Sequence, residues 1–159
     1  MVIKIRWRYN CSKCNNIFCD DCLTKENGYK LCQSCHKEFS QYIQHWVTGT
    51  KHEYIKGYSI VKEIGLIEVS EECDSPADVE SLLQTKSAML GANSYIKYFW
   101  DKHIQYHSEE YQAGTGAKGN PYYKTRNYTT KYFTGFAIAV LVQKKTKKLN
   151  ENTRMTPIL

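Results

Sequence analysis

Six of the seven cysteines lie within the first 35 residues, and they form three Cys-x-x-Cys pairs: Cys11/Cys14, Cys19/Cys22 and Cys32/Cys35. The two residues between paired cysteines form a tight turn that lets both thiolates reach one ion, and two pairs complete the tetrahedron that zinc prefers. A segment this short has almost no hydrophobic core of its own. It therefore needs a cross-link, such as a bound metal ion, to offset the entropy lost when it is ordered. The pattern therefore predicts Zn²⁺ binding, with sulfurs for one and a half sites.

Loop lengths favour one way of pairing the cysteines. Joining Cys11/Cys14 to the second pair closes a loop of only four residues, whereas joining them to the third pair closes a loop of seventeen. We therefore expect one complete metal site built from Cys11, Cys14, Cys32 and Cys35.

The remaining pair, Cys19 and Cys22, is half of a second site on this interpretation. His36, His45 or Cys73 could supply a further ligand. A segment upstream of Met1 could instead carry the missing pair, or the two cysteines could stay reduced with no second ion.

Patterned segments flank the cysteines. Residues 3–9 alternate apolar side chains with Lys4, Arg6 and Arg8, which predicts a strand with one basic face and a candidate anion-binding surface. After the last pair, an apolar stripe at helical spacing predicts a helix that ends at Gly49; its members are Phe39, Ile43, Trp46 and Val47.

The pattern of residues in the second half of the sequence predicts, in order, a strand, a helix, a strand, a long loop and a strand. The first strand covers residues 58–69, and the helix has Ser75 as N-cap, Pro76 at its first position and Gly91 at its end. One face of this helix should pack on a sheet and the other should be wet. The last strand is apolar on both sides over residues 136–142, so we expect it to be central in a sheet or covered by a neighbouring subunit.

The predicted long loop contains Gly114, Gly116 and Gly119 in the G-x-G-x-x-G spacing of a dinucleotide site. That motif needs a helix after it. Here Pro121 leads into another strand, so a mobile hairpin loop is the better interpretation. Side chains that flank the loop could stack on nucleic-acid bases, although interface aromatics and solvated cations explain them more simply; they are Tyr111, Tyr122, Tyr123, Tyr128, Lys118, Lys124 and Arg126.

Catalytic chemistry has little support in the sequence. No nucleophile and base, phosphate loop or carboxylate pair stands at an informative spacing, and His103 and His107 are a weak pair on one strand face. We expect no enzyme, and a cleft lined by both histidines and Asp101 would overturn that expectation.

Composition bounds the class of protein. The 159 residues carry a net charge of +6, and neither a signal peptide nor an apolar run of membrane-spanning length is recognisable. We expect a soluble cytoplasmic protein with a zinc module at residues 1–50, an α+β domain with a mostly antiparallel β-α-β-β sheet at 51–145, and a basic flexible tail at 146–159.

Residues 10–39 resemble the latter two thirds of a FYVE-type zinc finger. The matching features are Phe18 before Cys19, the gap between the first two pairs, and the last pair before a helix. The resemblance implies alternating pairing, with a partner pair for Cys19 and Cys22 upstream. The basic signature that recognises phosphatidylinositol 3-phosphate is reduced to Arg8, so that ligand is not carried over.

Residues 57–143 resemble the YbjQ-like family of putative heavy-metal-binding proteins. The likeness covers the first strand, the helix end with its Leu-Gly-Ala-Asn motif, and the closing strand with an internal glycine. It implies an α+β subunit that assembles into a ring, a pentamer by resemblance.

Together these features predict a non-enzymatic zinc-binding interaction and assembly protein whose finger is displayed on an oligomer, where weak contacts add up through avidity. One alternative is metal handling or metal and redox sensing through a labile Cys19/Cys22 pair. Another is binding of an anionic membrane surface or nucleic acid by the basic N-terminal strand. A protein partner for the finger is also compatible with the sequence.

Overall fold

A computed structural model describes residues 8–146, and it combines helices with antiparallel sheets, as the predicted α+β class requires. The elements in chain order are β1 (Arg8–Asn10), β2 (Ile17–Cys19), a 3-10 turn (Asp20–Cys22), β3 (Leu23–Glu26), β4 (Tyr29–Cys32), α1 (Gln33–Gln44), β5 (Tyr58–Cys73), α2 (Pro76–Met89), β6 (Ser94–Thr115) and β7 (Pro121–Lys144). Neither α1 nor α2, the helices of the described residues, combines the length and apolar character needed to cross a membrane.

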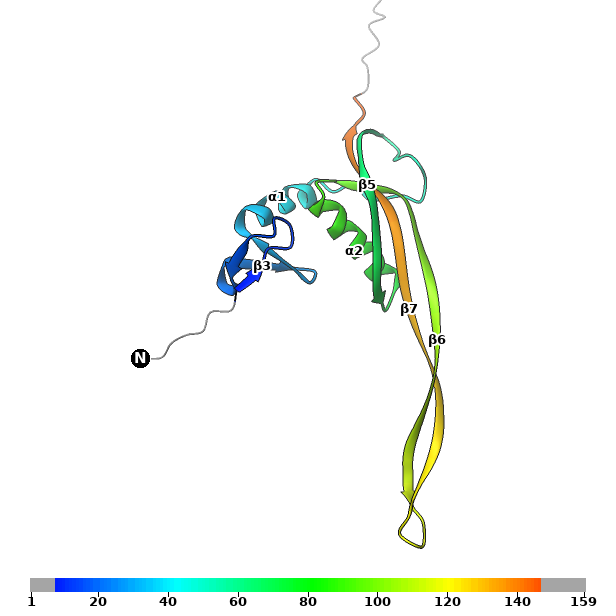
Figure 1. Cartoon of the computed structure of the whole chain (residues 1–159). Helices are drawn as coiled ribbons and strands as arrows, with labels where there is room; N and C mark the ends of the chain where they lie inside the picture. The colour runs from blue at the N-terminus through cyan, green and yellow to red at the C-terminus, as the bar shows by residue number, and fades with distance from the viewer. Residues whose placement is uncertain (1–7, 147–159) are drawn as a thin grey trace, which may run out of the picture.

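The main sheet has the strand order β5-β7-β6, with all pairs antiparallel. The closing strand is therefore central, as its apolar character on both sides predicts. Helix α2 covers one face of this sheet (Figure 1). Val79 and Leu83 of α2 are fully buried there against β5 and β7.

The ends of α2 follow from its sequence. The Ser75 hydroxyl accepts a hydrogen bond from the Asp78 backbone N–H at 3.3 Å, and Pro76 occupies the first turn, where no N–H is needed. After the C-cap at Leu90, Gly91 adopts a φ of +88°, which a residue with a side chain rarely tolerates.

The prediction that the second face of α2 is wet holds for its first turns, where Asp78 and Ser81 are exposed, and is wrong toward its end. Thr85 and Ala88 are buried, and Ala88 packs in a cluster with Cys11, Leu31 and Phe39 of the cysteine-rich segment. The cause is tertiary: α1 and the cysteine-rich segment lie beside α2, on the side away from the sheet (Figure 1).

Helix α1 ends earlier than predicted, at Gln44 rather than near Gly49. Val47 donates its backbone N–H to the Asn93 carbonyl oxygen at 2.8 Å, so the chain has already left the helix. Gly49 has a different role, because a Cβ at this position would overlap the Tyr95 ring.

The predicted long loop is mostly strand. β6 continues to Thr115 and β7 starts at Pro121, so only residues 116–120 turn the chain. The ladder includes Gly114, which pairs with Tyr122 and leaves room for its ring. Beyond the last β5 pair, Cys73 with Phe133, the two strands project alone as a twisted ribbon (Figure 1). We call residues 102–132 the arm.

The strand predicted over the first nine residues is described only from Arg8, and Lys4 and Arg6 lie outside the described residues. The basic tail lies outside them too, apart from residue 146. The division of the chain near residue 50 stays a prediction.

Gly135 on β7 provides a test of how tightly α2 packs on the sheet. A Cβ at this position would lie 2.5 Å from Cγ1 of Val79 and 2.7 Å from the Phe99 carbonyl oxygen. We expect Gly135→Ala to lower the free energy of unfolding by about 1–3 kcal/mol, because overpacking forces backbone shifts. Urea unfolding measures the change, and Gly65→Ala, a strand glycine with open space at its Cβ, is the matched control. Equal stability of both variants would contradict the packing.

Candidate metal centre

The first cysteine pair lies at the turn between β1 and β2, which pair antiparallel. Cys11 donates its backbone N–H to the Asn16 carbonyl oxygen at 2.8 Å, and Asn15 donates to the Cys11 carbonyl oxygen at 2.9 Å. Asn15 has a φ of +60°, a left-handed conformation that asparagine tolerates better than most residues. These bonds hold Cys11 and Cys14 on one tight turn.

The third pair lies where β4 runs into α1. Cys32 is the last residue of β4 and the N-cap of α1, which places Cys35 in the first helical turn. The Cys32 backbone N–H donates to Sγ of Cys11 at 3.3 Å. Ser12 and Lys30 exchange two further bonds, from the Ser12 N–H to the Lys30 carbonyl oxygen at 2.7 Å and from the Lys30 N–H to the Ser12 hydroxyl at 3.0 Å.

The two pairs converge on one point. Sγ atoms of Cys11, Cys14, Cys32 and Cys35 all lie within 4.8 Å of one another, and those of Cys14 and Cys32 are 3.9 Å apart. A tetrahedral zinc with Zn–S bonds of about 2.3 Å needs sulfurs about 3.8 Å apart. The cluster therefore has the dimensions of a four-sulfur metal site, and Cys14 is its one exposed member.

Backbone donors prepare this cluster for negative charge. Burial opposes ionisation of Cys11, but backbone N–H groups of Cys14, Cys32 and Lys13 outweigh it and lower the pKa of Cys11 to about 6. Burial and the neighbouring Cys32 thiol raise the pKa of Cys35 to about 12. Four adjacent thiols cannot all ionise without a cation, whose binding would release their protons.

Cys19 and Cys22 are separate from this cluster. Cys19 is half-buried, Cys22 is exposed, and contact with the Cys19 side chain raises the pKa of Cys22. Within residues 8–146, no second group of three or more cysteine, histidine or acidic side chains brings its ligand atoms together.

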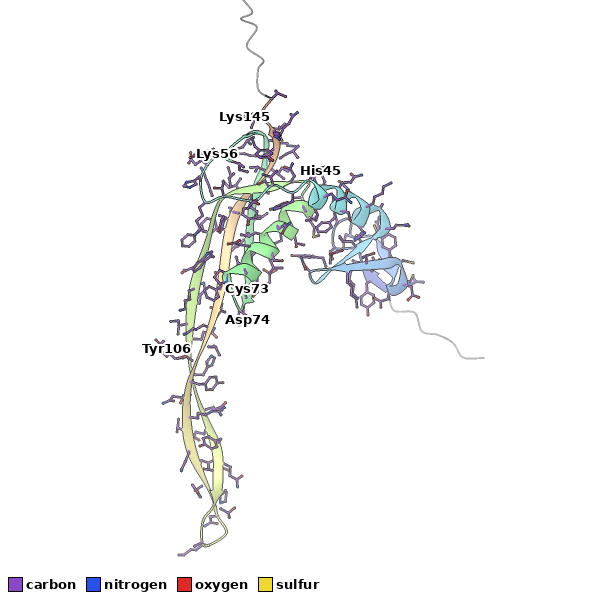
Figure 2. All side chains as sticks on the ribbon, turned by 180° about the vertical axis from the view of Figure 1, so that it is seen from behind. His45, Lys56, Cys73, Asp74, Tyr106 and Lys145 are labelled. Atoms are coloured by element: carbon purple, nitrogen blue, oxygen red, sulfur yellow. The ribbon has the colours of Figure 1, made fainter. Side chains whose placement is uncertain are left out.

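The candidate ligands for a second site therefore lie apart from that pair. His36 directs Nε2 to Oε1 of Glu26 at 3.1 Å, and His45 is the C-cap residue of α1. Cys73 is buried at the far end of β5, beside the start of α2 (Figure 2). The structure thus brings none of the three to Cys19 and Cys22.

A hairpin turn and a hydrogen bond, both missed by sequence reasoning, position the cysteine-rich segment. Asn27 and Gly28, with φ values of +43° and +84°, form the tight turn between β3 and β4, and an Asn-Gly pair is the usual signal of such a hairpin. The Asn27 side-chain amide donates to the Thr85 hydroxyl of α2 at 2.7 Å. Only the turn could have been found from the sequence.

The remaining candidate residues do not form a common cleft. Arg8 on β1 is exposed. His103 and Asp101 line one shallow hollow on the sheet, whereas His107 lines another farther along the arm. Each histidine contacts a threonine, Thr134 at 2.8 Å for His103 and Thr130 at 2.7 Å for His107. The glycine-rich segment is followed by strand β7 rather than by a helix.

Comparison with known proteins gives a local likeness. No family model and no solved structure matches the chain. It is similar to the probable inactive serine/threonine-protein kinase slob1 of Dictyostelium discoideum, 43% identical over 54 residues, in an alignment that covers 28% of this chain. The aligned part is 9% of that relative, so the likeness shows no family. The FYVE-like and YbjQ-like resemblances stay predictions.

The Asn27–Thr85 contact predicts that the cysteine-rich segment and α2 stabilise each other. Thr85→Val keeps the shape of the side chain but removes the acceptor of the Asn27 amide. Because Asn27 is exposed and water can replace the acceptor, the loss should be the net value of one hydrogen bond, about 0.5–1.5 kcal/mol of unfolding free energy. Thr129→Val, on the exposed arm, is the matched control and should change stability by less than about 0.5 kcal/mol. Thermal unfolding measures both, and a loss no greater than that of the control would show that the contact is not formed.

Proposed function

We propose that this protein is a non-enzymatic zinc-binding interaction and assembly protein, in which a finger held by Cys11, Cys14, Cys32 and Cys35 is displayed on an oligomeric α+β scaffold. The observation that carries the proposal is the convergence of the four sulfurs. Four thiolates fill the tetrahedron of a zinc ion and leave no open position for water or substrate. A closed site of this kind favours a structural role over catalysis.

The sheet face opposite α2 supports the assembly half of the proposal. Three large apolar side chains are exposed there: Leu66 at 71%, Phe99 at 54% and Phe136 at 45%. Leu66 pairs with Ile138, two residues along β7 from Phe136, and the ring centroids of Phe99 and Phe136 lie 5.6 Å apart. An apolar surface of this kind is typical of an interface between proteins. Several fingers on one oligomer would bind a repeated partner through avidity.

Native mass spectrometry of zinc-supplied protein tests both halves at once. We expect one tightly held zinc per chain and the mass of an oligomer of two or more chains. Cys11→Ser should lose the tight zinc, because three thiolates leave the tetrahedron incomplete. The matched control, Cys22→Ser, should keep it. A monomer without metal would contradict the whole proposal, and equal zinc loss in both variants would contradict the assignment of ligands.

A second candidate, metal or redox sensing, is favoured by the position of the Cys19/Cys22 pair outside the four-sulfur cluster, with Cys19 half-buried and Cys22 exposed. Thiolates with incomplete coordination exchange metal and react readily.

Alkylation separates the two candidates. For a structural role, iodoacetamide should alkylate Cys19 and Cys22 of the zinc-loaded protein no faster than it alkylates a small peptide thiol at the same pH. The protein should also not retain a second zinc. Faster modification, slowed by added zinc, would favour sensing instead. The Cys11→Ser variant shows in the same assay how quickly the cluster thiols react once their ion is lost.

A further inference from the structure

The arm leaves two long strand edges unpaired. At the start of β6 the outer edge is covered, since Thr50 and His52 exchange backbone hydrogen bonds with Tyr95, Lys97 and Tyr98 at 3.0–3.2 Å. Past that point, the ladder gives β6 no neighbour besides β7. β7 has β5 as its second neighbour only as far as Phe133. From there to the turn, both strands carry rows of backbone groups without a partner strand among residues 8–146.

The arm is built to keep its shape. His103 stacks on Tyr132 with ring centroids 4.7 Å apart, and four residues farther along His107 stacks on Tyr128 at 4.9 Å. These are directly opposed pairs on the ladder, and each histidine also contacts a threonine on β7. The repeated unit fixes the register of two strands whose other side chains are largely exposed.

The two strands of the arm carry opposite net charges. Among the arm residues, β6 holds Glu109 and Glu110 toward its end, against Lys102 near its start. The β7 part, residues 121–132, carries Lys124, Arg126 and Lys131 and no acidic residue. Glu109 and Arg126 already form an ion pair within the ribbon, although their side chains stay 43% and 64% exposed.

We propose that the arms of neighbouring copies of this chain pair edge to edge, with β6 of one copy beside β7 of the next in an antiparallel ladder. Each acidic strand then lies between two basic strands. Charge attraction and backbone hydrogen bonds therefore favour the same pairing of strands. An isolated two-stranded ribbon is marginally stable in water, whereas added strands satisfy its edges. This inference rests on the assembly half of the proposed function.

The pairing also determines the symmetry of the assembly. Different edges of the two copies meet, so the interface is heterologous, and a heterologous interface either closes into a ring or continues as a filament. Closure removes every open edge of the arm except its turn. Tyr106, 82% exposed and labelled on the arm in Figure 2, would then lie on a continuous surface of strands from several copies.

Nucleic acid is the rival occupant, because exposed tyrosines beside cations can stack on bases and contact phosphates. The arm is less suited to it than to another copy. Glu109 and Glu110 stand on the same narrow ribbon, and Glu109 already neutralises Arg126. A phosphate backbone would be repelled by these carboxylates, whereas the neighbouring arm offers them cations.

Charge reversal and mixing test the pairing. The acid-reversed variant is Glu109→Lys with Glu110→Lys, and the base-reversed variant is Lys124→Glu with Arg126→Glu. Light scattering coupled to size exclusion should show an oligomer for the unmodified chain and a dissociation constant raised about tenfold or more for each variant. An equimolar mixture of the two variants should assemble again, because each reversed edge then meets its complement. Lys56→Glu, in the exposed loop at the opposite end of the sheet (Figure 2), is the control and should assemble normally.

The outcomes separate this inference from the proposed function. Oligomers that persist in both reversed variants, or a mixture that fails to reassemble, overturn the pairing of arms while assembly itself stands. A monomeric unmodified chain overturns the assembly half of the proposed function together with the pairing. A monomer that retains nucleic acid, and loses it in the base-reversed variant, assigns the arm to nucleic acid instead. Zinc content and far-ultraviolet circular dichroism of each variant confirm that it is folded.

Discussion

The convergence of four sulfurs from two distant Cys-x-x-Cys pairs is the interaction on which the N-terminal half depends. Residues 8–32 form only short strands and one 3-10 turn, and few of their side chains other than cysteine are buried. The backbone bonds from Ser12 and Cys32 bring the two pairs together, but they leave four thiols in contact. A cation that replaced the protons would relieve the crowding and cross-link the segment.

The same segment is tied to the rest of the chain. Leu31 and Phe39 pack with Ala88, and Asn27 bonds to Thr85. The last turns of α2 are therefore covered on one side by the sheet and on the other by the cysteine-rich segment. Helix α2 therefore lies between the four-sulfur cluster and strands β5, β6 and β7. Beyond this shared core the arm projects without cover, which places the four-sulfur cluster and the arm on separate parts of the molecule (Figure 1).

Local signals predicted much of this arrangement. The caps of α2 at Ser75 and Gly91 and the central place of β7 follow from residues whose effects act within a few positions. The alternating pairing follows from loop length, and the structure has the proximity that it requires. The prediction of a long loop is wrong because glycine does not break the strand here, since Gly114 makes room for Tyr122 within the ladder. The burial of Thr85 and Ala88 on the second face of α2 could not be predicted, since it depends on how the cysteine-rich segment folds back on a distant helix.

X-ray absorption at the zinc edge tests the central claim most directly, because it reports the atoms bound to the metal. Protein purified with one zinc per chain should show four sulfur neighbours at about 2.3 Å and no nitrogen or oxygen neighbour. Two sulfurs accompanied by nitrogen or oxygen at about 2.0 Å would contradict the account, since the ion would then lie outside the cluster of Cys11, Cys14, Cys32 and Cys35.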